Sequence, residues 1–276
     1  MTEMPIFDEK IERFRRRLKI GNKSSHTIAS YMNFVSDFKE FAKKEVGLLT
    51  KEDMEDYFFH LSEDREMKPN SIRLARMALK QFFDTLGMNL VDDIPAPKIG
   101  RRLPKFLTRD EVASLIAACK SERDRAITHL LYCGLRVGEV VAITHGDLDL
   151  DNRKVRVRGK GDKQRFPRLS NTAVESLRLY MAESQRNTLP TDAHVFEVTT
   201  RRIQQFIERA AKRAGIAKAT PHMLRHSFAT HVLQSGVSIR YIQQLLGHSS
   251  LNTTEIYTNV VDEDLDKIRM PGDRLG

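Results

Sequence analysis

Residues Thr220–Tyr257 read TPHMLRHSFATHVLQSGVSIRYIQQLLGHSSLNTTEIY. Thr220 is a typical helix cap, and Pro221 suits the first helical position, where a missing N–H has no cost. Gly236 and Gly247 predict the ends of two successive helices, because glycine readily ends a helix. The stretch therefore predicts two helices, and we expect a third, short helix to carry its final tyrosine.

Four side chains of this stretch carry chemistry, namely His222, Arg225, His248 and Tyr257. His222 and Arg225 are three residues apart and so share one face of the first helix. The planar guanidinium suits phosphate oxygens, imidazoles transfer protons near neutral pH, and a phenol acts as a covalent nucleophile. Any one of these residues alone is more often structural, whereas the set indicates phosphoryl transfer.

The charge of the chain favours a polyanionic partner. The 276 residues carry a net charge of +9. Residues 1–100 hold 17 basic and 17 acidic side chains, so residues 101–276 carry all of the excess. Neutralising phosphates releases condensed counterions, which favours nucleic-acid binding, although a solvated basic surface has the same composition.

The sequence predicts a soluble, cytoplasmic protein. No apolar run is long enough to span a bilayer, and the first residues, MTEMPIFDEK, lack the regions of a signal peptide. Cys119 and Cys133 lie in apolar helical patterns and are expected to be reduced core residues. They are too few for a metal cluster.

The first hundred residues read as helices only. Apolar residues recur at helical spacing in residues 7–19, 25–47, 50–61 and 69–87. Thr50 with Asp53 resembles a capping box at the start of the third segment. We interpret the apolar stripes as the core of a four-helix bundle in a domain of residues 1–94.

Residues 95–107 are expected to form a linker, because their prolines prevent a continuous helix. Its basic side chains are candidates for contacts with a phosphate backbone, namely Arg101, Arg102 and Lys105. The second domain, residues 108–276, opens with Thr108 and Glu111 at capping-box spacing.

Two helices are expected next, at residues 109–118 and 122–133, followed by the sequence GLRVGE. Arg136 in this sequence lies just beyond the helix end, and Glu139 follows three residues later. We expect the carboxylate to hold this arginine while its remaining donors point elsewhere, although a plain ion pair fits the spacing equally well.

Residues 153–168 predict a basic β-hairpin. Val155 and Val157 alternate with arginines, which is the period of a half-exposed strand, and a Gly-Lys-Gly-Asp turn follows. The segment holds eight basic residues and one acidic residue. Lys160 at the tip is a candidate to reach into a neighbouring site. The other candidates for DNA contacts are Arg156, Arg158, Lys163 and Arg165.

The remaining segments are scaffold. We expect helices at residues 171–184 and 200–214 and a short strand at residues 194–196, which makes the fold mainly α with a small β-sheet. His222 and His226 lack the glutamate of a zinc-protease helix, so metal binding is not favoured.

The ordered motifs GLRVGE, GKGDKQR, HMLRHSFATH and LGH, followed by Tyr257, resemble the tyrosine recombinase (phage integrase) family, in particular its Xer-type members. The resemblance covers nearly the whole chain. It implies an N-terminal four-helix, SAM-like bundle that binds core DNA and a mixed α/β catalytic domain. Gly138 departs from the serine of many relatives.

The resemblance also implies roles for single residues. Tyr257 would form a 3′-phosphotyrosyl bond, Arg136 and Arg225 would hold the non-bridging oxygens, and Lys160 would protonate the leaving 5′-oxygen. His222 would accept the phenol proton, His248 would donate to the phosphate, and Glu139 would support the arginines. Neither a metal nor a cofactor is implied.

The implied partner is double-stranded DNA, bound by four protomers on two sites, each lending a C-terminal helix to its neighbour. Resolution of chromosome dimers at a dif-like site is the expected function, with a second recombinase or a regulator as further possible partners. The alternatives are a mobile-element integrase, a type IB topoisomerase and a non-catalytic architectural DNA-binding protein.

Overall fold

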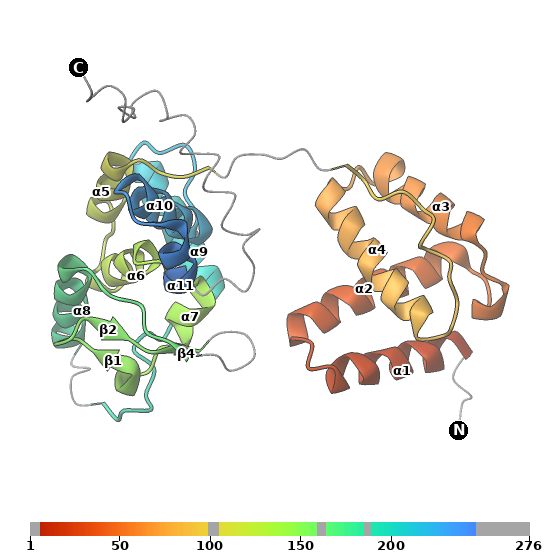
Figure 1. Ribbon diagram of the computed structural model, residues 1–276, viewed down its shortest axis with the longest axis horizontal. Helices are drawn as coiled ribbons and strands as arrows, with labels where there is room; N and C mark the ends of the chain where they lie inside the picture. Colours follow the sequence, from red (N-terminus) through yellow and green to blue (C-terminus); the bar gives the residue numbers. More distant parts are fainter. Residues whose placement is uncertain (1–5, 99–104, 159–163, 185–188, 247–276) are drawn as a thin grey trace, which may run out of the picture. The chain divides into compact units, whose positions relative to one another are not determined.

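The computed structural model describes residues 6–98, 105–158, 164–184 and 189–246. The chain divides into two compact units, Met1–Arg101 and Arg102–Gly276. Figure 1 shows that helices dominate both units. This architecture confirms the predicted fold class.

The first unit is a bundle of four helices (Figure 1), as expected. The helices are α1 (Ile6–Ile20), α2 (Ser25–Ala42), α3 (Lys51–Phe59) and α4 (Pro69–Asp84), with a short 3₁₀ turn η1 (Val46–Leu48) and a π-turn η2 (His60–Asp64).

Local sequence signals explain where these helices begin and end. Thr50 and Asp53 form the expected capping box, in which the Asp53 carboxylate accepts the Thr50 N–H at 2.9 Å. Pro69 is the first residue of α4. Helix α2 ends earlier than expected, because Lys43 adopts a left-handed backbone conformation (φ 49°) several residues before Gly47.

Aromatic side chains fill the centre of the bundle. Phe14 and Phe38 are fully buried, and Phe14 meets Phe82 edge to face with 5.4 Å between ring centroids. The Tyr57 hydroxyl donates to Asp37 at 2.7 Å, which satisfies a polar group at the edge of the core. Burial and this carboxylate raise the pKa of Tyr57.

The second unit is built around α6 (Glu122–Tyr132), which packs against α8 (Asn171–Glu183) and α10 (Pro221–Gln234). The other helices are α5 (Arg109–Ala117), α7 (Val137–Ala142), η3 (His145–Asp147), α9 (Thr200–Arg213) and α11 (Ile239–Leu246). Most of their apolar faces enclose one core, which includes Leu130, Leu177 and Ile207, while Ala229 of α10 packs with Ile242 and Leu246 of α11 in a separate small cluster. Cys119 and Cys133 are free and buried, as predicted, and burial raises the pKa of both thiols.

The strands form two small antiparallel sheets. β1 (Leu148–Asp149) pairs with β2 (Lys154–Val155), and β3 (Val157–Arg158) pairs with β4 (Gln164–Arg165). The two arms of the predicted hairpin therefore pair, while its turn lies outside the described residues.

Two details of the predicted strands were wrong. Residues 153–158 do not form one strand, because Arg156 leaves the ladder and its N–H donates to the Asp147 carbonyl at 2.8 Å. Residues 194–196 form only a single bridge, between His194 and Thr144, instead of a strand. Strand β1 was not anticipated, since its two residues are too few to show a period.

Among the described residues, no helix combines the length and apolarity needed to cross a bilayer.

Candidate active site

Arg136 and Glu139 meet at the start of α7. Gly134 ends the preceding helix with φ 86°, so the chain turns and Arg136 becomes the N-cap of α7. The Glu139 carboxylate accepts the Arg136 N–H at 2.7 Å and its Nη1 at 2.9 Å. The arginine side chain is 39% exposed while the glutamate side chain is 6% exposed. A buried carboxylate thus holds a guanidinium at the protein surface.

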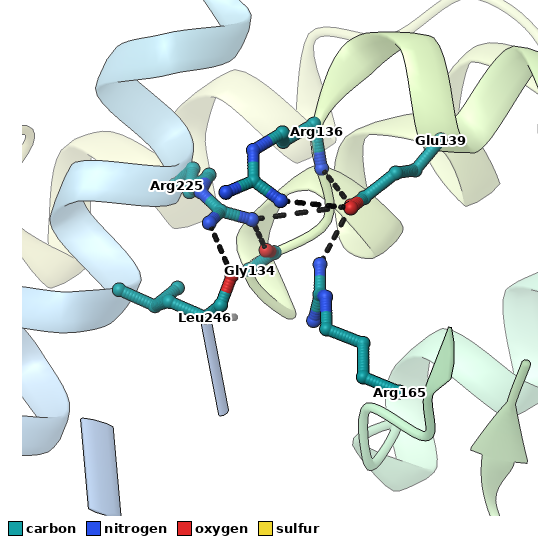
Figure 2. A network of polar contacts seen from close by, with 6 residues as sticks. All are labelled: Gly134, Arg136, Glu139, Arg165, Arg225 and Leu246. Atoms are coloured by element: carbon teal, nitrogen blue, oxygen red, sulfur yellow. Dashed lines mark hydrogen bonds and ion pairs between the residues drawn. The ribbon is translucent and has the colours of Figure 1, made fainter. Parts of the chain in front are cut away.

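Arg225 reaches the same carboxylate from α10. It is only 4% exposed. Its Nη1 donates to the Gly134 carbonyl and lies 3.9 Å from Glu139 Oε2, while its Nη2 donates to the Leu246 carbonyl at 2.6 Å. Arg225 therefore joins the ends of three helices, α6, α10 and α11, beside Arg136 (Figure 2).

A third arginine, Arg165 of β4, completes this group. Its Nη2 binds Glu139 Oε2 at 2.6 Å, and its side chain is 13% exposed. Burial lowers the pKa of Arg165 from its ordinary value, and the Glu139 carboxylate opposes that shift. The sequence predicted Arg165 only as a DNA contact and gave no sign that it binds Glu139.

The arrangement has more positive than negative charge. Three guanidinium groups, those of Arg136, Arg165 and Arg225, face the single carboxylate of Glu139 (Figure 2). In the described part of the chain, guanidinium groups thus outnumber carboxylates in this cluster, and such a positive group favours an anion. Guanidinium groups match the geometry of phosphate oxygens particularly well.

His222 is exposed in the first turn of α10, one turn before the buried Arg225. Its ring stacks on that of His226, with 6.2 Å between centroids. Burial, followed by the neighbouring His222 and Arg225, lowers the pKa of His226. In the described parts of the chain, no group of three or more His, Cys, Asp or Glu side chains is arranged to hold a metal ion.

The other candidate residues divide into two groups. Lys105 and Arg158 are exposed, and Arg156 binds Asp147 with its Nε 2.8 Å from Oδ1. The remaining candidates lie outside the described residues, as does the expected C-terminal helix: Arg101, Arg102, Lys160, Lys163, His248 and Tyr257.

The end of the expected linker contacts α10. The Leu107 N–H donates to Ser227 Oγ at 2.8 Å, and Leu107 is buried in the core of the second unit. The Phe106 ring meets His231 edge to face at 6.1 Å. Residues 106–107 are therefore attached to the helix that carries Arg225, and proline spacing gives no signal of this attachment.

Known proteins are similar to this chain in sequence and in fold. Residues 105–264 match the model of the phage integrase family, and residues 11–92 match that of the phage integrase N-terminal SAM-like domain. The tyrosine recombinase XerA of Thermococcus kodakarensis is 37% identical over 270 residues, which cover 94% of each chain. The chain belongs to the phage integrase family. As a tyrosine recombinase, it is an enzyme of site-specific recombination that works through a tyrosine-linked intermediate.

Solved structures agree with the membership of this family. The crystal structure of a XerA recombinase is 34% identical, covers 96% of this chain and 99% of its own, and superposes with a TM-score of 0.56. The XerH recombinase in a post-cleavage complex with palindromic difH superposes with a TM-score of 0.74 at 23% identity, covering 89% of this chain and 80% of its own. The second likeness supports the fold of this tyrosine recombinase.

Proposed function

We propose that this tyrosine recombinase cuts and rejoins double-stranded DNA at a specific site through a 3′-phosphotyrosyl intermediate. The observation that carries the proposal is the cluster in which Arg136, Arg165 and Arg225 surround Glu139. A scissile phosphate is the kind of anion that this excess of guanidinium charge binds.

In the proposed reaction, each bond change and each proton transfer is assigned to a residue. Tyr257 Oη attacks phosphorus, a tyrosyl P–O bond forms, and the bond to the 5′-oxygen breaks. His222 accepts the phenol proton, since an ordinary phenol pKa of about 10 makes tyrosine a poor nucleophile at neutral pH. Lys160 donates a proton to the leaving 5′-oxygen.

The negative charge of the transition state lies on the non-bridging oxygens. Arg136 and Arg225 would contact these oxygens, and His248 would add a hydrogen bond. The phosphotyrosine retains the energy of the broken bond, so that a free 5′-hydroxyl reverses the step without ATP. Attack by a hydroxyl from a second duplex exchanges strands.

We further propose that four protomers assemble on two DNA sites in the cytoplasm and resolve chromosome dimers at a dif-like sequence. Xer-type relatives matched over nearly the whole chain support this role, and one related structure is described as XerH bound to difH. A second recombinase or an accessory regulator is compatible with this proposal.

A suicide duplex tests the chemistry. We expect the purified protein to form a covalent protein–DNA band without ATP, and Tyr257→Phe to abolish the band while DNA binding persists. Tyr241→Phe is a matched control, because Tyr241 is 65% exposed on α11. Persistence of the band in Tyr257→Phe would exclude this nucleophile. Binding of candidate sites without any band would favour an architectural DNA-binding protein.

A sulfur-substituted leaving group tests Lys160. A 5′-bridging sulfur needs no proton to depart, so it should restore cleavage by Lys160→Ala. Failure of this rescue would mean that Lys160 is not the general acid.

A plasmid with two directly repeated candidate sites tests the biological role. Conversion of the plasmid into two circles is expected for a resolvase, whereas cleavage and relaxation without exchange would indicate topoisomerase activity.

A further inference from the structure

The two faces of the β3–β4 hairpin differ sharply. Val157 pairs with Arg165 and Arg158 pairs with Gln164, so each pair shares one face of the ladder. Val157 is buried in the core, while Arg158 and Gln164 are exposed. The strand register therefore directs Arg165 inward although it lies in a strongly basic segment.

Backbone hydrogen bonds that do not involve the Arg165 side chain hold the base of the hairpin. The Val155 N–H donates to the Pro167 carbonyl at 3.2 Å, and the Leu169 N–H donates to the Arg153 carbonyl at 2.8 Å. These backbone bonds fix the base of the hairpin. The Arg165 side chain is thus available for a role other than holding the strands together.

Arg165 acts through its contact with Glu139. Its Oε2 accepts Arg165 Nη2 at 2.6 Å and the Arg136 N–H at 2.7 Å, and it lies 3.9 Å from Arg225 Nη1. The Glu139 side chain is 6% exposed, so water screens these interactions little. Without Arg165, the full negative charge of Glu139 would act on the other two arginines.

We propose that Arg165 is a positioning residue of the recombinase. By binding Glu139 Oε2, it neutralises part of the carboxylate charge, and Arg136 and Arg225 keep their orientation and their positive field toward the scissile phosphate. This inference rests on the proposed function, which gives those two arginines their contact with the non-bridging oxygens.

The test compares Arg165→Met with Lys154→Met. Both changes remove one positive charge from residues 153–168, but Lys154 is exposed and is not among the candidate DNA contacts. The assay is single-turnover cleavage of a saturating suicide duplex, with either an ordinary scissile phosphate or a methylphosphonate that lacks the non-bridging negative charge.

Arg165→Met is expected to slow cleavage of the phosphate substrate about tenfold or more. This is the size of effect typical when a residue that supports a reacting group is lost. Cleavage of the methylphosphonate substrate should slow less than about twofold. Lys154→Met is expected to leave both cleavage rates at saturation unchanged. In a Glu139→Gln background, Arg165→Met should add little, because the carboxylate through which it acts is absent.

The inference would be overturned if Arg165→Met slowed cleavage of both substrates equally. It would also be overturned if a 5′-bridging sulfur restored the cleavage rate of Arg165→Met and the methylphosphonate did not. Arg165→Lys covers the case in which Arg165→Met does not fold. It keeps the charge without the planar fork, and we expect a smaller loss with the same preference for the phosphate substrate. A Lys variant with no such preference would also overturn the inference.

Arg136→Ala separates this inference from the proposed function. If the methylphosphonate does not reduce the defect of Arg136→Ala, the phosphate-binding role of the arginines is wrong. If it reduces the defect of Arg136→Ala but not that of Arg165→Met, the proposed function stands and the role of Arg165 is wrong.

Discussion

Gly134 lies in direct contact with the ring of Phe228. A Cβ atom at position 134 would lie 2.8 Å from Cδ1 and from Cε1 of Phe228, and 3.2 Å from Leu246 Cδ2. The glycine also has φ 86°, a conformation that costs side-chain-bearing residues free energy. The end of α6 therefore approaches α10 and α11 only because no side chain intervenes.

Gly134→Ala should lower the free energy of unfolding by about 2–4 kcal/mol, through backbone strain together with overpacking. Urea denaturation measures this loss. Gly215→Ala is the matched control, because Gly215 has φ 71° but no atom within 4 Å of an added Cβ. It should lose only about 1–2 kcal/mol from backbone strain. Equal losses of unfolding free energy in the two variants would show that the Phe228 ring moves aside without an energetic cost.

Two arginines of the site, Arg225 and Arg136, should respond differently to truncation. Arg225→Ala should lower the free energy of unfolding by about 3–5 kcal/mol, since it leaves two carbonyls and part of Glu139 without a buried partner. Arg136→Ala removes a 39% exposed side chain and should cost less than about 1.5 kcal/mol. Cleavage should fall at least about 100-fold in both variants. A stable Arg225→Ala protein would contradict the structural role of its carbonyl contacts.

Gly138→Ala should stabilise the protein by about 0.5–1 kcal/mol, because glycine within a helix has a higher entropy cost than alanine. Gly138 lies in α7, and no atom lies within 4 Å of an added Cβ. The midpoint of urea denaturation should therefore rise. A fall would mean that this helix start requires the freedom of glycine.

Acidification should destabilise the second unit. Burial lowers the pKa of His226, and burial together with Arg125 lowers the pKa of His129. The unfolded chain binds protons at these residues below a pH of about 6.5, while the folded chain still keeps them neutral. Stability should therefore decrease as the pH falls from 7.5 to about 5.5.

Urea denaturation at both pH values measures this decrease, and His226→Gln should reduce it. A free energy of unfolding that is constant or higher at the lower pH would contradict the half-buried, neutral state of these histidines.

Helices and their caps were the most predictable features. Thr50, Thr108 and Thr220 all cap the helices assigned to them, because the capping signal depends only on residues three positions apart. The Arg136–Glu139 pair was predictable for the same reason. The split at Arg156 was not, since it depends on Asp147, which a separate segment supplies.

The inward position of Arg165 could not be predicted from the sequence, for a different reason. The alternation of valine and arginine assigns Arg156 and Arg158 to an outer face, but it does not reveal the register across the turn. Pairing with Val157 decides that Arg165 faces the core. The attachment of Leu107 to Ser227 was equally hidden, because the partners are 120 residues apart.

Arg225 also constrains the order in which the protein folds. Its guanidinium joins carbonyls that lie 91 residues before it and 21 residues after it in the chain. Contacts over such separations form late, since the chain entropy of closing long loops opposes them. The arginine therefore takes its final position only after α6, α10 and α11 have packed together. A partly folded chain lacks this arrangement, so under the proposed function a molecule can break a DNA strand only after its folding is complete.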